Sequence, residues 1–277
     1  MSLRINTNVG ALNAYGNLSA NQASLQNAFE KLSSGLRINK AADDAAGLSI
    51  SQGLTSQING LTQAVRNAQD GTNVAQIADG ALATVQKILQ RQRDLAVQAA
   101  NGGSQDTAAQ TAAQAEITNL NTQLDNISKT TSFGGTKLLD GTYTAAVGVF
   151  QVGANNSANE QISLALTSSD STTLGVNAVS VSSTAGAQTA IGTIDTAIAN
   201  VSKARSQIGA TQNQLGYTIS NLQTTIQNVT ASRSNITDAD LATEVTAMSQ
   251  AQILTSAATS VLAQANSAPQ AILKLLQ

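Results

Sequence analysis

The stretch between Ile58 and Ala99 repeats small and apolar residues every seven positions, and this repeat limits the possible folds more than any other feature. One series is Leu61, Ala68, Ala75, Leu82, Leu89 and Ala96, and a second, three residues later, is Ala64, Gly71, Ala78, Val85, Gln92 and Ala99. Such a heptad seam predicts a coiled-coil helix. At 1.5 Å per residue it would be a rod of roughly 60 Å. A single rod cannot cover its own seam, so a partner helix must run alongside it.

A second heptad series occupies the carboxyl-terminal half of the chain, from about Gly186. It comprises Ile194, Val201, Ile208, Leu215, Leu222 and Val229, with Ile198, Ile219 and Ile226 four residues after members of it. Arg205 and Gln212 take two of the complementary positions. Polar residues there weaken a seam but fix its register.

Both ends of the chain carry shorter amphipathic patterns that predict helices. The amino-terminal pattern has Leu18, Leu25 and Leu32, with Phe29 and Leu36 at the complementary offset, and the carboxyl-terminal pattern has Leu241, Val245, Met248, Gln252, Val261, Leu262 and Ala265, interrupted only at Pro269. The sequence Ser33-Ser34-Gly35 indicates a break after the first helix. Because a lone amphipathic helix of this length is marginal, we expect the two terminal helices to pair.

The middle of the chain changes character twice. Asn101-Gly102-Gly103-Ser104 predicts a helix stop, and apolar residues from Ala113 to Ile127 predict an antiparallel return helix that Phe133-Gly134-Gly135 ends. From Tyr143 to about Val181 the apolar residues alternate with polar ones, as at Ile162, Leu164 and Leu166 and then at Val176, Val179 and Val181. Turns of Gly, Asn and Ser separate these groups, which predicts short strands in one or two hairpins.

Composition excludes several classes of protein. Aromatic residues are only 2% of the chain, so the core must be thin and extended. The net charge of −2 gives no reason to expect nucleic acid, and a charged fraction of only 11% weakens repulsion between copies, which hints at self-assembly. Without Cys or His, thiolate chemistry and the commonest metal ligand and general base are missing. We therefore expect no enzyme and no cofactor.

The Asp43-Asp44 pair raises the question of a metal site, and the first residues of the chain raise the question of export. Asp43-Asp44 is adjacent to small residues, which favours a helix N-terminus or a subunit contact over a metal site. The first residues lack the apolar run of a secretory signal, and about 18 consecutive apolar residues occur nowhere, so we expect no membrane insertion. The default location is the cytoplasm, and export would need a route that does not read a cleavable signal.

Several long motifs, in the same order, make the chain similar to bacterial flagellin over nearly its whole length. The matching stretches are Leu3–Asn8, Leu32–Asn39, Ala41–Ile50, Leu89–Gly102, Ala251–Leu254, Ser260–Asn266 and Pro269–Leu276. The resemblance implies a mostly α fold: a long antiparallel coiled-coil bundle with a small β-hairpin region and with both termini helical and paired. It further implies a terminal domain of residues 1–43 plus 238–277 in the inner filament core, and an outer-core domain of residues 44–237 with the hairpins at about 143–183. The short middle implies that the exposed outer domains are absent.

The resemblance also implies partners and contact residues. The partners are other copies of the chain, hook-associated and cap proteins, a flagellar secretion chaperone and an animal Toll-like receptor, and the location is the secreted flagellar filament. Receptor contact and subunit packing fall on Gln90, Arg91, Leu95 and Glu116, of which packing is the primary role, and Gln92 and Asp94 depart from the commonest residues of that motif. Terminal-domain assembly falls on Leu18, Leu25, Leu32, Leu241, Val245, Met248 and Leu262.

Two functions remain open from the sequence. The first is a structural subunit that self-assembles into the bacterial flagellar filament for swimming motility. The alternative is a soluble coiled-coil signalling or adaptor protein that does not polymerise. Low charge favours the first, because coiled-coil adaptors usually select partners through charged flanking positions.

Overall fold

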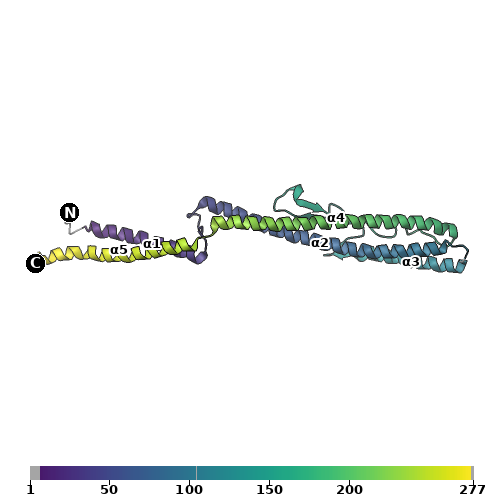
Figure 1. Cartoon of the computed structure of the whole chain (residues 1–277), viewed down its shortest axis with the longest axis horizontal. Coiled ribbons are helices and arrows are strands. Elements are labelled where there is room, and N and C mark those ends of the chain that lie inside the picture. Colours follow the sequence, from purple (N-terminus) through teal and green to yellow (C-terminus); the bar gives the residue numbers. More distant parts are fainter. Residues whose placement is uncertain (1–6, 104, 276–277) are drawn as a thin grey trace. The chain divides into compact units, whose positions relative to one another are not determined.

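The structure is a computed structural model that describes residues 7–103 and 105–275, with side chains to residue 267. Its elements are α1 (Val9–Ser34), α2 (Ala45–Ala99), α3 (Thr107–Thr130), β1 (Ser132–Phe133), β2 (Thr136–Lys137), β3 (Val149–Gln151), the 3₁₀ turn η1 (Ala158–Glu160), β4 (Gln161–Ser163), α4 (Thr184–Thr237) and α5 (Leu241–Leu275) (Figure 1). The predicted mostly α fold, with long helices and a small β region, is confirmed.

The contacts divide the chain into two compact units. The terminal unit comprises Met1–Ser56 and Asn228–Gln277, and the central unit comprises Gln57–Gln227. These limits lie about ten residues inside the predicted boundaries at 43/44 and 237/238. Turn residues mark where helices end, whereas α2 and α4 continue through both limits as unbroken helices.

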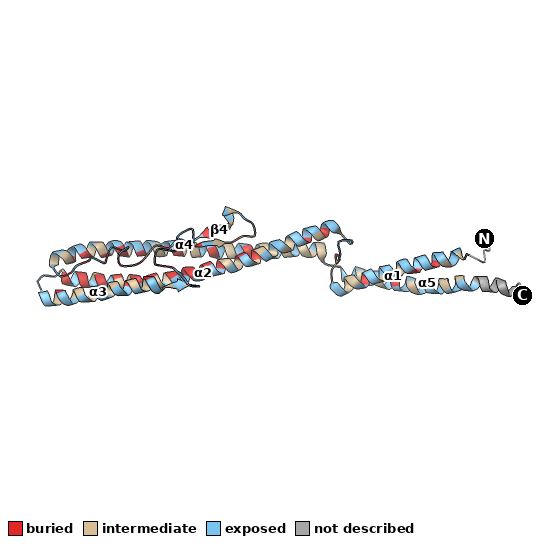
Figure 2. Ribbon diagram, turned by 180° about the vertical axis from the view of Figure 1, so that it is seen from behind, coloured by how far each residue is buried: buried red, intermediate tan, exposed pale blue. Residues whose placement is uncertain are grey.

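In the central unit, α2, α3 and α4 lie side by side (Figures 1 and 2). They enclose one large apolar cluster, and two smaller clusters follow along α2 and α4 around Leu215 and around Leu61 with Leu222. The seam residues Leu61, Leu82, Leu89, Ile194, Val201, Ile208, Leu215 and Leu222 are all buried. Val229, the last member of that series, belongs to the terminal unit and is half-buried. Alanines such as Ala68, Ala75 and Ala78 are fully buried as well, because small side chains let the helix axes approach closely.

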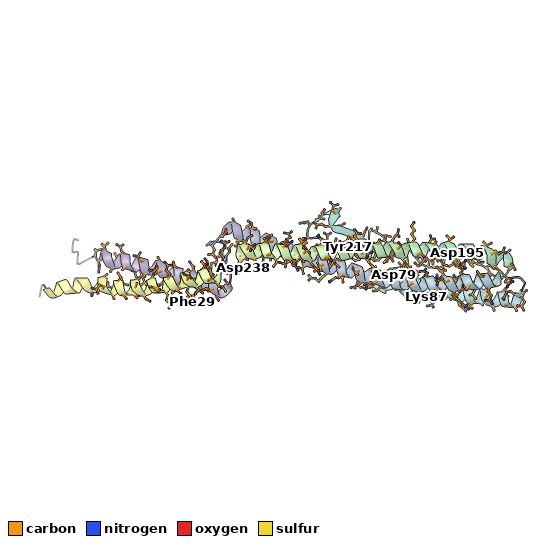
Figure 3. The ribbon with its side chains drawn as sticks, viewed as in Figure 1. Phe29, Asp79, Lys87, Asp195, Tyr217 and Asp238 are labelled. Atoms are coloured by element: carbon orange, nitrogen blue, oxygen red, sulfur yellow. The ribbon has the colours of Figure 1, made fainter. Side chains whose placement is uncertain are left out.

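Two ion pairs join α2 to α4 in the central unit. The guanidinium of Arg205 binds Asp79 through two nitrogens, with Nε 2.7 Å from Oδ1, and Nη1 also donates to Gln86. Arg93 binds Asp195 in the same forked way, with Nε 2.6 Å from Oδ1. Figure 3 labels both aspartates. Forked pairs accept one alignment of the two helices, so Arg205 has the contacts that a register-fixing residue requires.

The β region differs from its prediction. One hairpin, β1–β2, lies before the predicted interval, and Gly134 and Gly135 form its two-residue turn with φ of 56° and 87°. Within 143–183 there is one two-stranded sheet, β3–β4, in which Phe150 pairs with Ile162. Two adjacent glycines with positive φ are typical of a two-residue hairpin turn. The Gly134-Gly135 dipeptide therefore indicates this hairpin, although we interpret it in the sequence only as the end of a helix.

The prediction of strands at Val176, Val179 and Val181 is wrong. These residues are buried, but they belong to an irregular strap, residues 164–181, that lies against α3. Side chains of α3 take the place of a neighbouring strand by bonding main-chain groups of the strap. Asn121 Nδ2 donates to Val176 O (3.0 Å) and Gln114 Nε2 donates to Val179 O (3.2 Å). In the other direction, Val181 N donates to Gln114 Oε1 (2.7 Å) and Ser171 N donates to Asp125 Oδ1 (2.8 Å). Buried residues therefore recur every two or three positions along the strap without a sheet.

The terminal unit pairs α1 with α5, as expected (Figure 1). On α1 the least exposed positions are Ala11, Ala14, Leu18, Asn21, Leu25, Ala28 and Leu32, and on α5 they are Glu244, Met248, Ala251, Thr255, Ala258, Leu262 and Ala265. The predicted α5 pattern is wrong at Leu241, Val245, Gln252 and Val261, because these four side chains are exposed beside the buried stripe. Phe29 is likewise 55% exposed, since Ala28 occupies the buried position.

Burial of the central seam gives a matched test. Ile194→Ala should cost about 2–5 kcal/mol of unfolding free energy, because Ile194 is fully buried between helices. Ile77→Ala, at a position of α2 that is 41% exposed, should cost under about 1 kcal/mol. Urea unfolding followed by circular dichroism measures both. Equal losses would mean that the seam does not pack as described.

Candidate assembly surfaces

The joint of the terminal unit is the pair of short connections at residues 35–44 and 237–240. Leu36 and Asp238 form an isolated antiparallel bridge, in which Arg37 N donates to Thr237 O at 2.7 Å. Ala239 N donates to Gly35 O at 3.0 Å, and the Arg37 guanidinium donates to Ile236 O at 2.7 Å. Main-chain bonds thus connect the two linkers that join α1 to α2 and α4 to α5.

Aspartates lie before α2 and α5 and directly after α4, whereas α1 ends at its cap residue Gly35. Asp44 caps α2 by accepting from Gly47 N at 2.8 Å, which confirms the predicted helix N-terminus, and Asp240 caps α5 through Ala242 N and Thr243 Oγ1, both at 3.0 Å. Asp43 instead accepts from the main-chain N–H groups of the loop before α2. Gly47 leaves room there for the Asp44 carboxylate and Ile38, both of which a Cβ would push aside.

Hydrogen bonds lower the pKa of several of these carboxyl groups. The hydroxyls of Ser234 and Thr237 donate to Asp238 and lower its pKa below the ordinary 3.8. Main-chain donors do the same for the pKa of Asp43, and Thr243 with Ala242 for the pKa of Asp240. Since each pKa is depressed on folding, the stability these carboxylates add is present above about pH 4 and is lost as the pH falls through the folded value.

The helix pair of the terminal unit leaves many apolar side chains in solvent. On α1 these are Val9, Leu12, Tyr15 and Phe29, and on α5 they are Leu241, Val245, Ile253, Leu254 and Val261. Two helices can bury only one stripe each against the other, so large side chains on the remaining faces find no cover within the unit. Exposed apolar groups at this density mark an interaction surface.

The predicted contact residues of the central unit divide into two groups. Gln90 and Arg91 are exposed on α2, and Arg91 Nε lies 2.7 Å from Glu116 Oε1 on α3. That bond raises the pKa of Arg91. Leu95 is only 4% exposed and packs in the core, so its expected place on the contact face is corrected. In a helix packed on two sides, position 95 faces inward while 90 and 91 face solvent.

Gln92, which the heptad series places in the seam, also makes a buried polar contact. Gln92 is almost fully buried and donates from Nε2 to Asn121 Oδ1 at 2.8 Å, while its Oε1 has no hydrogen-bond partner. Asn121 in turn holds the strap. Gln92 therefore contacts α3 directly, supports the strap through Asn121, and belongs to the packing of the central unit. Its place in the heptad series was the only signal in the sequence.

Among the described residues, no cluster of three or more His, Cys, Asp or Glu side chains could hold a metal, and no helix is long and apolar enough to cross a bilayer. What the fold presents is a coiled-coil bundle whose two chain ends form one helix pair with uncovered apolar faces. These features define a class of protein, the helical coiled-coil subunits in which both termini pair.

Comparison with known proteins gives the family. Residues 5–144 match the family model of the bacterial flagellin N-terminal helical region, and residues 191–276 match that of the C-terminal helical region. The chain belongs to the bacterial flagellin family.

Two curated relatives show how far the likeness extends. The chain is 48% identical over 183 residues to flagellin of Bacillus subtilis, covering 63% of this chain and 60% of the relative. It is 46% identical over 175 residues to polar flagellin A of Vibrio parahaemolyticus, covering 63% of this chain and 46% of the relative. The chain thus matches about half to three fifths of the length of these relatives.

One solved structure agrees with this chain at the level of fold. A protein assigned to the flagellar hook-associated class, from Vibrio parahaemolyticus, superposes with a TM-score of 0.57 at 16% identity, over 71% of this chain and all of the other. Flagellin of Bacillus cereus has a TM-score of 0.49 at 29% identity, over 57% of this chain and 88% of the other.

The hydroxyl donors at the joint give a second test. Ser234→Ala should raise the pKa of Asp238 toward 3.8, because one donor to the carboxylate is lost. Ser232→Ala is the matched control, since Ser232 bonds the main chain of Asn228 instead. Carboxyl ¹³C chemical shifts followed against pH report the value directly. An unchanged pKa in Ser234→Ala would contradict the assigned contact.

Proposed function

We propose that this chain is a structural subunit that self-assembles into the bacterial flagellar filament for swimming motility. The observation that carries the proposal is the terminal helix pair with its uncovered apolar faces, in a chain of the flagellin family. Copies stacked along an axis cover those faces for one another. The work of the protein is mechanical, and the proposal includes no catalytic step and no cofactor.

The energetics of the terminal unit favour coupling between ordering and assembly. Between α1 and α5 the buried stripe is mostly alanine, with Leu18 as its largest buried side chain. Such a pair contributes little apolar burial by itself, whereas side chains such as Leu12, Ile253 and Val261 gain burial only against another copy. Assembly therefore adds stability that the isolated subunit does not have.

The proposal extends to export and to the ends of the filament. The expected partners are a flagellar secretion chaperone that holds the carboxyl-terminal helix, hook-associated proteins, and a cap protein under which subunits fold. The location is then outside the cell. Absence of Cys and a single Pro suit a chain that is threaded unfolded and refolds at its destination, because disulfides and slow prolyl isomerisation do not delay it.

A second contact face is proposed on the central unit. The exposed Gln90 and Arg91 of α2 and the half-buried Glu116 of α3 form a polar surface that is free to pack against a neighbouring subunit. The same face is the expected contact for an animal Toll-like receptor when subunits are released. Leu95 supports that face from beneath.

Elongation of filament seeds tests the proposal. Purified, dissociated protein returned to neutral buffer with short seeds should extend them, as seen by negative-stain electron microscopy. Failure of folded protein to extend seeds, or to form filaments with precipitant, would instead favour the alternative of a soluble coiled-coil adaptor. Arg91→Ala should assemble less well if the second face packs between subunits, and unchanged assembly would overturn that part.

The exposed apolar residues of α5 make a sharper prediction. Ile253→Ala should raise the critical concentration for assembly roughly tenfold, because a side chain that is 68% exposed in the subunit contributes about 1–2 kcal/mol when covered. Ser256→Ala, at an exposed polar position of the same helix, should change it less than about threefold. Sedimentation of polymer measures both. Equal effects would contradict apolar burial as the driving term.

Removal of residues 238–277 separates folding from assembly. The central unit draws its core from Gln57–Gln227 and should keep its helical circular dichroism and cooperative unfolding. Without α5 the terminal helix pair cannot form, so seeds should not elongate. Filaments formed by the shortened chain would refute the role given to the terminal unit.

A further inference from the structure

The chain contains two Asn-Gly dipeptides in different main-chain settings. Asn59-Gly60 lies in the interior of α2, and Asn101-Gly102 lies in the turn just after that helix ends. Both asparagine side chains are exposed. The two sites therefore share their chemistry and their access to water and differ in the conformation of the peptide.

Asparagine followed by glycine can modify itself. The main-chain nitrogen of the glycine attacks the side-chain Cγ of the asparagine, a C–N bond forms, and ammonia leaves with the proton of that nitrogen. Water then opens the five-membered succinimide at either carbonyl, which gives aspartate or isoaspartate. No other reactant is needed, and the missing Cβ of glycine removes the steric barrier to the approach.

Helical structure blocks this reaction at Asn59. The nitrogen of Gly60 is held in the helical ladder of α2, and Gly60 packs so closely on Ala154 that a Cβ would lie 2.9 Å from the alanine methyl. Attack on Cγ requires the peptide to rotate out of the helix. Opening α2 at this point is part of the barrier.

The turn after α2 does not hold its glycine nitrogen in a helical ladder, although Gly102 also lies close to Thr184. Asn101, Gly102 and Gly103 are all exposed, and Gly102 N donates only to Ala100 O, two residues back, at 3.1 Å. The Asn101 side chain folds forward over the glycines: its Oδ1 would lie 3.6 Å from a Cβ built on Gly103. We propose that Asn101 is a site of self-catalysed deamidation, at which the chain acquires aspartate and isoaspartate with age.

The product would alter the α2–α3 turn. Asn101 O accepts from Gln105 N at 3.2 Å, and isoaspartate reroutes the main chain through the side-chain carbons and displaces that acceptor. A new carboxylate would also stand at the carboxyl-terminal end of α2, where the helix dipole disfavours negative charge. Both changes loosen the turn.

Peptide mapping of the aged full-length chain tests the assignment. After incubation in mildly alkaline buffer, tandem mass spectrometry of tryptic peptides should show a gain of about one mass unit at Asn101. The rate of deamidation at Asn101 should be at least about tenfold higher than the rate at Asn59. Isoaspartyl methyltransferase should label the same peptide. No gain at Asn101, or equal rates at the two asparagines, would overturn the proposal.

Unfolding and matched variants identify the cause. In concentrated urea the two rates should converge to within about threefold, because only the fold distinguishes the sites; a persistent difference would refute the conformational argument. Gly102→Ala should slow the reaction, whereas Gly103→Ala should not, since only Gly102 supplies the nucleophile. Circular dichroism checks folding, because a Cβ on Gly102 lies 3.0 Å from Thr184 Oγ1. Equal rates in the two variants would also overturn the assignment.

Discussion

A helix of 55 residues cannot cover its own apolar seam, and the rest of the central unit depends on this constraint. Lateral pairing of α2 with α4 and α3 buries Leu82, Leu89 and Ile194 completely. With alanine at many seam positions, each layer adds little volume, so stability has to accumulate along the length of the helices. Because similar layers repeat along the helices, α2 and α4 could pair in a shifted register. The forked Arg205–Asp79 and Arg93–Asp195 pairs select one alignment of these two helices.

The terminal unit meets the same constraint with fewer helices. Two helices bury one stripe each, and the joint satisfies their main-chain ends through the Leu36–Asp238 bridge and the Asp44 and Asp240 caps. The remaining apolar faces have no cover within the unit. Many other surface positions are Asn, Gln, Ser and Thr, so charge repulsion between copies is weak and the subunit is ready to associate.

The segment after α3 shows how a polar helix face can replace a sheet. Gln114, Asn121 and Asp125 bond the main chain of the strap, which lets Val176 and Val181 reach the core in irregular conformation. Buried main-chain groups must be paired, and in this unit helix side chains do the pairing. The β3–β4 sheet is correspondingly small and lies where Gly71 leaves room for Phe150 on α2.

The sequence by itself determined the helices, their approximate ends and the need for partners, because heptad spacing, Gly35 and the Asn101–Gly103 turn act through local geometry. It also indicated the pairing of the termini and the family. Tertiary structure decided what spacing cannot specify. Leu95 is buried because a third helix covers that side of α2, whereas Leu241 and Val245 are exposed because the α1–α5 contact follows Glu244, Met248 and Ala251. The apolar residues at 176, 179 and 181 indicate which side chains are buried, and only the side chains of α3 determine that this burial occurs without a sheet.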